Sequence, residues 1–238
     1  MTQPAPHPGE PHDAGTSGRL NQLRAGVLGA NDGIVSTAGI VVGMAAATTS
    51  GPVILSAGLA GVAAGALSMA AGEYVSVSTQ RDTEKAMLAT ERIELREDPE
   101  AELDELAGLY EAKGLTPDLA HEVAVALTEK DALRAHAEVE LHIDPDELTS
   151  PWQAAVASIV AFTIGGALPL LAVLLVPTTA RIPVTFVAVV LALALTGSVS
   201  ARLGQAPPGR ATVRTVIGGA LAMGVTYALG SAFDVSGM

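Results

Sequence analysis

Residues 52–79 read PVILSAGLAGVAAGALSMAAGEYVSVST, an apolar run of 28 residues in which Glu73 is the only charged side chain. About 20 apolar residues, wound as a helix, are enough to cross the hydrocarbon core of a bilayer. Gly, Ala and Ser make up much of the run, and such small residues let helices approach closely inside a membrane. The stretch therefore predicts a tightly packed transmembrane helix.

Four more apolar segments of similar length lie in the rest of the chain, at residues 26–47, 152–176, 182–201 and 213–232. Each is long enough to span a membrane as a helix. The sequence therefore predicts an all-α polytopic membrane protein with five transmembrane helices. Spans 1 and 2 fall within residues 19–79, and spans 3 to 5 within residues 151–238.

The charge is concentrated between spans 2 and 3. Residues 80–150 hold 20 of the 25 Asp and Glu side chains of a chain whose formal net charge is −12. Span 2 is expected to continue into this region as a helix, and Asp98-Pro99 and Thr116-Pro117 are typical helix starts. Gly114 is expected to end the intervening helix, and Asp131 to cap a further one. We expect a small, acidic, water-exposed helical domain inserted between the two spans.

Basic residues predict the orientation. Most of the basic residues that flank the five spans lie at one side of the membrane, and the opposite side has only Arg181. Those on the first side are Arg19, Arg24, Arg81, Lys85, Arg202, Arg210 and Arg214. The positive-inside rule then places the N-terminus and the acidic insert in the cytoplasm. Residues 1–18 are rich in Pro and Gly and predict a disordered tail rather than a signal peptide. A bacterial plasma membrane is the expected location.

Two carboxylates interrupt the apolar spans. Asp32 lies six residues into span 1, and Glu73 lies about six residues before span 2 returns to the same side, so the two can meet in one site. Carboxylates inside a membrane commonly mark ion or proton pathways. Met69, one turn before Glu73, adds a thioether that suits a transition metal. The alternatives are an interfacial cap for Asp32 and simple packing for Met69.

The insert carries three pairs of side chains that could bind a metal, each spaced to share one helix face: Glu91 and Glu94, Glu102 and Glu105, and His136 and Glu140. Oxygen ligands with one imidazole fit Fe²⁺, Mn²⁺ or Zn²⁺. The alternative is that these side chains form a solvated acidic surface.

Several classes of protein are disfavoured. The chain has no cysteine, which excludes disulfides, thiolate metal sites and iron–sulfur clusters. No nucleophile–base pair or cofactor loop is recognisable, so we expect neither an enzyme nor a permanently bound cofactor. The acidity argues against nucleic acid as a partner. A membrane protein that buffers or senses metal without transporting it is the alternative to a transporter, and would need the insert but not Asp32 and Glu73.

Five stretches resemble the vacuolar iron transporter family, over a range from Leu20 to Gly230. They are LRAGVLGANDGIVSTAGIVVG at 23–43, GALSMAAGEYVSVSTQRDTEKA at 65–86, ERIELREDPEAELDELAGLYEAKGL at 91–115, PWQAAVASIVAFTIGGALPLL at 151–171 and VSARLGQAPPGRATVR at 199–214. The resemblance implies a five-span homodimer that moves Fe²⁺, and often Mn²⁺, out of the cytosol in exchange for protons. The pathway is implied to lie between spans 1 and 2 of the two subunits.

The same resemblance assigns the candidate residues. Asp32, Met69 and Glu73 match the intramembrane motif of the family. Glu91, Glu94, Glu102 and Glu105 match glutamates of its cytosolic metal-binding domain, and Glu140 matches a later glutamate. One departure concerns His136-Ala137, where some members have a pair of methionines. Some bacterial relatives also carry an N-terminal ferritin-like domain; the short tail stands in its place here, so no ferroxidase activity is implied.

Overall fold

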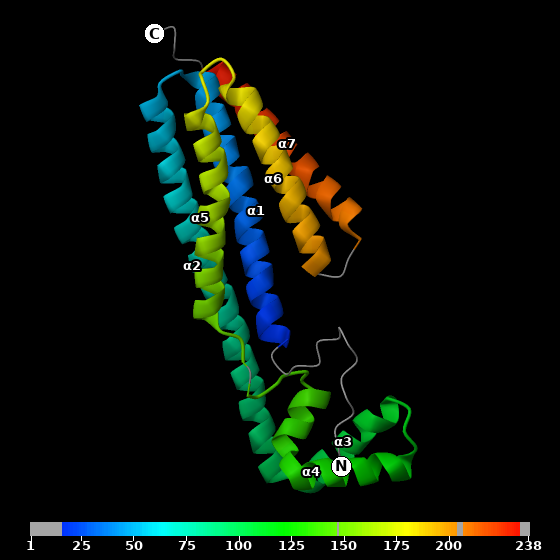
Figure 1. Ribbon diagram of the computed structural model, residues 1–238. Coiled ribbons are helices and arrows are strands. Elements are labelled where there is room, and N and C mark those ends of the chain that lie inside the picture. Colours follow the sequence, from blue (N-terminus) through cyan, green and yellow to red (C-terminus); the bar gives the residue numbers. More distant parts are fainter. Residues whose placement is uncertain (1–15, 147, 204–206, 234–238) are drawn as a thin grey trace. The chain divides into compact units, whose positions relative to one another are not determined.

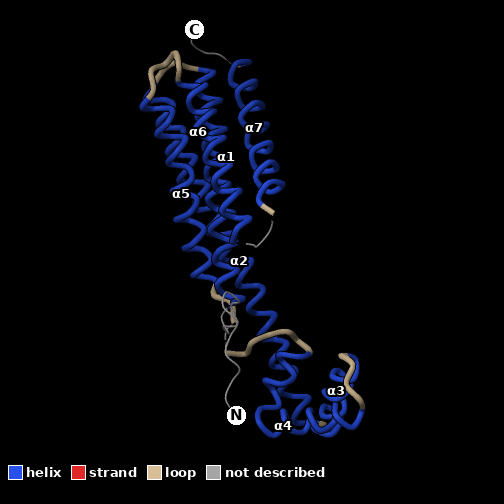
Figure 2. The backbone as a smooth tube through the Cα atoms, turned by 45° about the vertical axis from the view of Figure 1, so that its right-hand side comes forward, coloured by secondary structure: helices blue, strands red, loops and turns tan. Residues whose placement is uncertain are grey.

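The computed structural model describes residues 16–146, 148–203 and 207–233. This part of the chain forms helices joined by loops, with no strand among the described residues (Figures 1 and 2). The helices are α1 Thr16–Ala47, α2 Gly51–Glu97, α3 Pro99–Ala112, α4 Pro117–Val139, α5 Pro151–Leu175, α6 Arg181–Leu203 and α7 Pro208–Ala232. The all-α prediction is confirmed.

Five helices are long and apolar enough to cross a membrane: α1 from Leu23 onward, α2, α5, α6 and α7. These five segments correspond to the five predicted spans and indicate an integral membrane protein. Helices α1, α2, α6 and α7 extend beyond the predicted apolar limits, because hydropathy marks the part that suits lipid whereas the hydrogen-bonded backbone continues into polar sequence. Helix α1 already begins at Thr16, inside the predicted tail, whose first 15 residues lie outside the described part of the chain.

The described chain divides into two compact units. One contains residues 76–151 together with residues 16–20, and the other contains residues 21–75 and the described part of the chain from Trp152 onward. The predicted insert of residues 80–150 falls within the first unit. Helix α2 contributes to both, and its polar second half is the extension that the sequence predicts for span 2.

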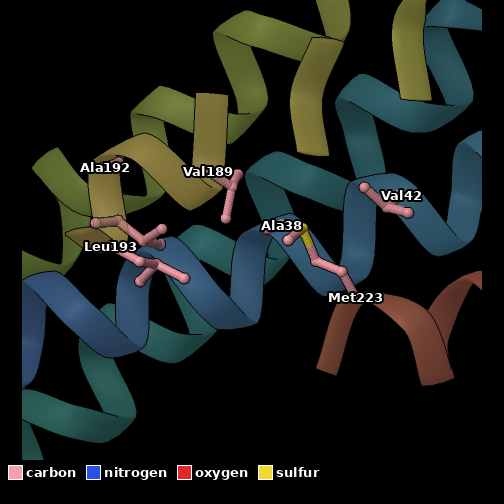
Figure 3. Close-up of a cluster of buried hydrophobic side chains, with 7 residues drawn as sticks. Ala38, Val42, Val189, Ala192, Leu193 and Met223 are labelled. Carbon is pink, nitrogen blue, oxygen red and sulfur yellow. The ribbon is translucent and has the colours of Figure 1, made fainter. Parts of the chain in front are cut away.

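The second unit is built around α1. One side of α1 packs Ala38 and Val42 against Leu193 of α6 and Met223 of α7, and Figure 3 shows the Met223 side chain beside Ala38. Another side packs Val41 against buried residues of α2 and α5. Apolar contacts on both sides make α1 the central helix of this unit.

Glycines allow the closest helix contacts in this unit. A Cβ atom on Gly33 of α1 would collide with the backbone of Phe162 in α5, and one on Gly165 of α5 would collide with the backbone of Ala30. The two helices therefore touch through their backbones, as small residues permit in membrane bundles.

The glycines of α2 have different surroundings. A Cβ atom on Gly61 would meet Ile40, and one on Gly65 would meet the ring of Phe162, whereas nothing lies within 4 Å of the Cβ position of Gly72. The first two glycines therefore serve packing within one chain. Of the three, Gly72 is the one whose Cβ position is open within the single chain.

The first unit follows the predicted start and stop signals. Asp98 accepts a hydrogen bond from the backbone N–H of Ala101 at the start of α3, and Gly114 has a φ of +101° just after α3 ends. Helix α4 begins at Pro117 as predicted, although Thr116 makes no side-chain cap. Apolar side chains of α3 and α4, centred on Leu106, pack between the two helices.

Asp131 interrupts α4, as the sequence predicts. Its backbone is extended, with φ −168° and ψ 93°, and its Oδ1 accepts a hydrogen bond from the backbone N–H of Arg134. This is the geometry of an N-cap, so a new helical segment begins here. That segment carries His136.

Candidate metal centre

His136 is the centre of a buried polar cluster in the first unit. Its side chain is fully buried, and its Nδ1 atom lies 3.0 Å from Oε1 of Glu91, 3.3 Å from Oε2 of Glu140 and 3.6 Å from Oε2 of Glu102. Glu91 comes from α2 and Glu102 from α3, while His136 belongs to α4. Three helices therefore bring one imidazole and three carboxylates together.

The cluster has the dimensions of a metal site. One ligand atom from each of Glu91, Glu102 and His136 lies within 4.8 Å of the other two. One buried oxygen of the cluster, Oε1 of Glu91, lacks a hydrogen bond although it lies 3.0 Å from Nδ1 of His136. Buried polar groups normally have a partner. A divalent ion with oxygen and imidazole ligands would satisfy the chemistry of this donor set.

Burial and crowding of negative charge perturb the acids of this cluster. Burial raises the pKa of Glu91 to about 7; the nearby His136 acts in the opposite direction, and the charges of Glu140, Glu102 and Glu94 add to the rise. Burial also raises the pKa of Glu102, again opposed by His136. A carboxylate that resists ionisation binds a cation in competition with a proton.

This perturbation predicts how pH changes the stability of the metal-free protein. The pKa of Glu91 is about 7 in the fold against an ordinary value of 4.5, so the folded state binds more protons between these values and loses stability as pH rises through them. The melting temperature of the metal-free wild type should therefore rise on acidification from pH 7.5 to 5.5. This rise should exceed the rise seen in Glu91→Gln by about 2 °C or more. Thermal unfolding of the detergent-solubilised full chain measures this; equal pH profiles for the two proteins would contradict it.

The polar side chains of the spans have a separate arrangement. Glu73 is buried in the second unit and lies 3.3 Å from Arg24 of α1, which is an ion-pair distance. Asp32 is exposed on the surface of the single chain, and Met69 is half-buried. In the described part of the single chain no ion pair or hydrogen bond joins Asp32 to Glu73.

Comparison with known proteins establishes the family. A sequence profile described as the VIT family matches residues 23–231. A protein named vacuolar iron transporter from Acanthamoeba castellanii is 45% identical over 224 residues, covering 93% of this chain and 82% of the relative. The chain belongs to the VIT family.

Plant relatives are also similar over most of their length. Vacuolar iron transporter homolog 5 of Oryza sativa is 38% identical over 92% of this chain and 84% of its own. Vacuolar iron transporter homolog 4 of Arabidopsis thaliana is 37% identical over 89% and 83%. The resemblance predicted from the five sequence stretches is thus confirmed, and both units of this VIT-family chain are included in it.

Four of the six predicted insert residues converge: Glu91, Glu102, His136 and Glu140. Glu94 and Glu105 are exposed, and each contributes negative charge to the cluster rather than a contact with the imidazole. The spacing of the residues predicted shared helix faces, but it could not tell which member of each pair points inward. That depends on how α3 and the second segment of α4 pack.

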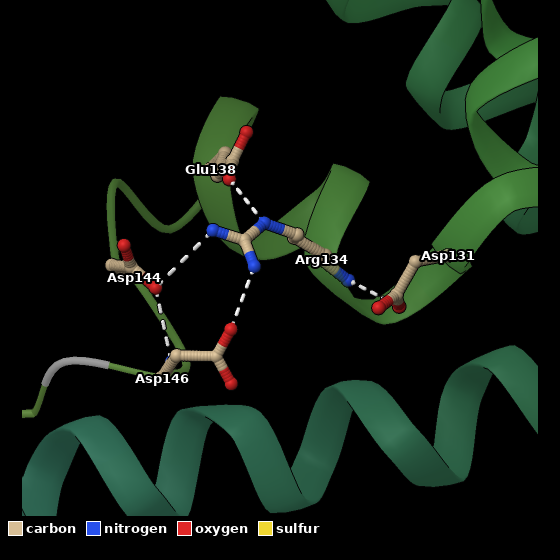
Figure 4. A network of polar contacts seen from close by, with 5 residues as sticks. All are labelled: Asp131, Arg134, Glu138, Asp144 and Asp146. Carbon is tan, nitrogen blue, oxygen red and sulfur yellow. Dashed lines mark hydrogen bonds and ion pairs between the residues drawn. The ribbon is translucent and has the colours of Figure 1, made fainter. Parts of the chain in front are cut away.

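Two arginines of this VIT-family chain make contacts that the sequence did not predict. Arg24 served only to predict orientation, yet it contacts Glu73. Arg134 lies two residues before His136 and binds Glu138 at 2.7 Å and Asp146 at 2.6 Å, with Asp144 at 3.6 Å (Figure 4). Its contacts tie the segment carrying His136 to the loop that follows α4. Glu138 lies four residues after Arg134 in the same helix, a spacing that permits an ion pair. The contacts with Glu73, Asp144 and Asp146 have no such signal, because those partners lie outside the helix of the arginine.

Proposed function

We propose that this protein is a proton-coupled transporter that moves Fe²⁺, and also Mn²⁺, out of the cytosol. The observation that carries the proposal is the buried Glu91–Glu102–His136 cluster, found in a chain that also has five helices suited to a membrane. The names of the relatives support iron as the cargo. The imidazole and carboxylate ligands suit Mn²⁺ equally well.

The proposed mechanism divides the work between the two units. Glu91, Glu102, His136 and Glu140 collect the ion from the cytosol, and Glu94 and Glu105 attract it by their charge. Asp32, Met69 and Glu73 then carry it through the membrane. Because metal and protons compete for the same carboxylate oxygens, protons arriving from an acidic far side release the metal.

Glu73 favours a transporter over a metal buffer. A buffer needs the cytosolic cluster alone, whereas this chain also buries a carboxylate within an apolar span, at a considerable cost in free energy. Metal uptake into proteoliposomes, measured with and without an acidic interior, tests the choice. A transporter accumulates Mn²⁺ faster when the interior is acidic; a buffer binds the ion without accumulating it.

We place the transport pathway in a homodimer, between α1 and α2 of the two subunits. Asp32 is exposed on the single chain although it lies within a membrane-spanning helix, and lipid is a poor environment for a carboxylate. A second subunit covering this surface would enclose Asp32 in a polar site. The exposed stripe of α2, which includes Leu67 and Gly72, offers an apolar face for that contact.

The dimer predicts opposite effects for two glycines of α2. Gly72→Leu should convert the dimer to monomer with little loss of melting temperature, because its Cβ position is open within the chain. Gly65→Leu should instead lower the melting temperature, since its side chain would collide with Phe162. Mass measurement in detergent, together with thermal unfolding, distinguishes them. A Gly72→Leu protein that stays dimeric, or a monomeric wild type, would refute this interface.

A further inference from the structure

An ion pair connects the first two membrane helices of the second unit. Nη2 of Arg24, near the start of the apolar part of α1, lies 3.3 Å from Oε2 of Glu73 on α2 and donates a hydrogen bond to it. The two side chains are 49 residues apart in sequence. The contact therefore exists only because α1 and α2 pack together.

The two partners differ in their access to solvent. The Glu73 side chain is 8% exposed, whereas the Arg24 side chain is 55% exposed. A carboxylate buried at this level needs a compensating cation, because removing one member of a buried pair leaves an uncompensated charge. Arg24 supplies that cation, and its long side chain remains partly in contact with solvent.

A single contact of 3.3 Å is also weak enough to be exchanged. Arginine binds carboxylates most tightly through two parallel hydrogen bonds, and here one nitrogen contacts one oxygen. A divalent cation interacts with the same oxygen more strongly than a single guanidinium nitrogen does, whereas a monovalent cation has no such advantage. The geometry thus favours displacement by a divalent ion.

We infer that Arg24 is the resident counter-ion of Glu73 in the metal-free state, and that the transported ion must displace it. The inference rests on the proposed function, since it makes Arg24 a competitor of the metal at Glu73. The guanidinium weakens metal binding during loading and returns to the carboxylate when the metal leaves, which speeds release. Arg24 thereby sets both the apparent affinity and the preference for divalent ions.

The alternative is that Arg24 merely ties α1 to α2. Removing a structural tie lowers stability and maximal rate but leaves the affinity for metal unchanged or weaker. Removing a competitor tightens metal binding. The sign of the change in affinity therefore separates the two roles.

The experiment compares three substitutions in the full chain. Arg24→Gln removes the charge, Arg24→Lys retains it, and Arg210→Gln removes an equal charge from an exposed position at the beginning of α7. Mn²⁺ uptake into proteoliposomes gives KM and maximal rate for each. The Mn²⁺ dependence of the melting temperature, in a Glu91→Gln, Glu102→Gln background that lacks the cytosolic cluster, reports binding without requiring transport.

Arg24→Gln should lower the KM for Mn²⁺ and the Mn²⁺ concentration that half-saturates the thermal shift by about three- to tenfold, with a lower maximal rate. Arg24→Lys should stay close to wild type. An unchanged or higher value for Arg24→Gln, or an equal decrease in Arg210→Gln, overturns the inference. If wild type moves no Mn²⁺ while Arg24→Gln still tightens binding, the proposed transport fails and the competition at Glu73 stands.

Discussion

Glu73→Gln is expected to reduce pH-driven metal flux about 100-fold, or to the level of empty liposomes. Glutamine has nearly the same shape as glutamate but cannot neutralise a divalent cation or exchange a proton for it. Because Glu73 is buried beside Arg24, the neutral amide also leaves the arginine without its counter-ion. The measurement is Mn²⁺ or Fe²⁺ uptake into proteoliposomes with an acidic interior.

Two controls make this result specific. Glu100→Gln removes a carboxylate from an exposed position at the start of α3 and should transport at the wild-type rate. Metal binding by the Glu91–Glu102–His136 cluster should survive in Glu73→Gln, because Glu73 belongs to the other unit. Flux at the wild-type rate in Glu73→Gln would mean that the ion does not pass this carboxylate.

The double variant Glu91→Gln with Glu102→Gln should weaken Mn²⁺ binding at the Glu91–Glu102–His136 cluster about 100-fold. Both carboxylates lie beside His136, and burial raises the pKa of each, so neutral amides are compatible with the fold. The loss should therefore arise from missing ligands rather than unfolding. Calorimetry or electron paramagnetic resonance of Mn²⁺ with the full chain measures the affinity.

The matched control is Asp118→Asn with Glu129→Gln. These two acids are exposed on α4, so the variant removes the same charge from the same unit without touching His136. Its Mn²⁺ affinity should change by about threefold or less, through long-range charge alone. Equal effects in the two double variants would support a solvated acidic surface instead of a built site.

The fold was largely predictable because its signals are local. Apolar length marked the five spans, and Asp98-Pro99, Thr116-Pro117 and Asp131 marked helix starts that the structure confirms. These features depend on a few neighbouring residues and on the solvent they prefer. They need no knowledge of which helix packs against which.

The candidate sites were predictable only in part because they depend on packing. Glu91 and Glu94 were equivalent by spacing, yet only Glu91 is buried against His136. Likewise, the sequence placed Arg24 and Glu73 near the same membrane face without predicting their contact. Which side chain of a helix points inward depends on the rotation of the helix about its axis. That rotation is determined by contacts with side chains distant in sequence.

The central claim is that metal and protons exchange through one pathway, and simultaneous recording of both fluxes tests it most directly. Proteoliposomes holding wild-type protein, a pH-sensitive dye and a metal-sensitive dye would be given external Mn²⁺ at an initially acidic interior. Exchange predicts that the interior becomes more alkaline as Mn²⁺ enters, and that a protonophore which collapses the pH gradient slows Mn²⁺ entry. Entry of Mn²⁺ at an unchanged rate, with no movement of protons, would contradict the account.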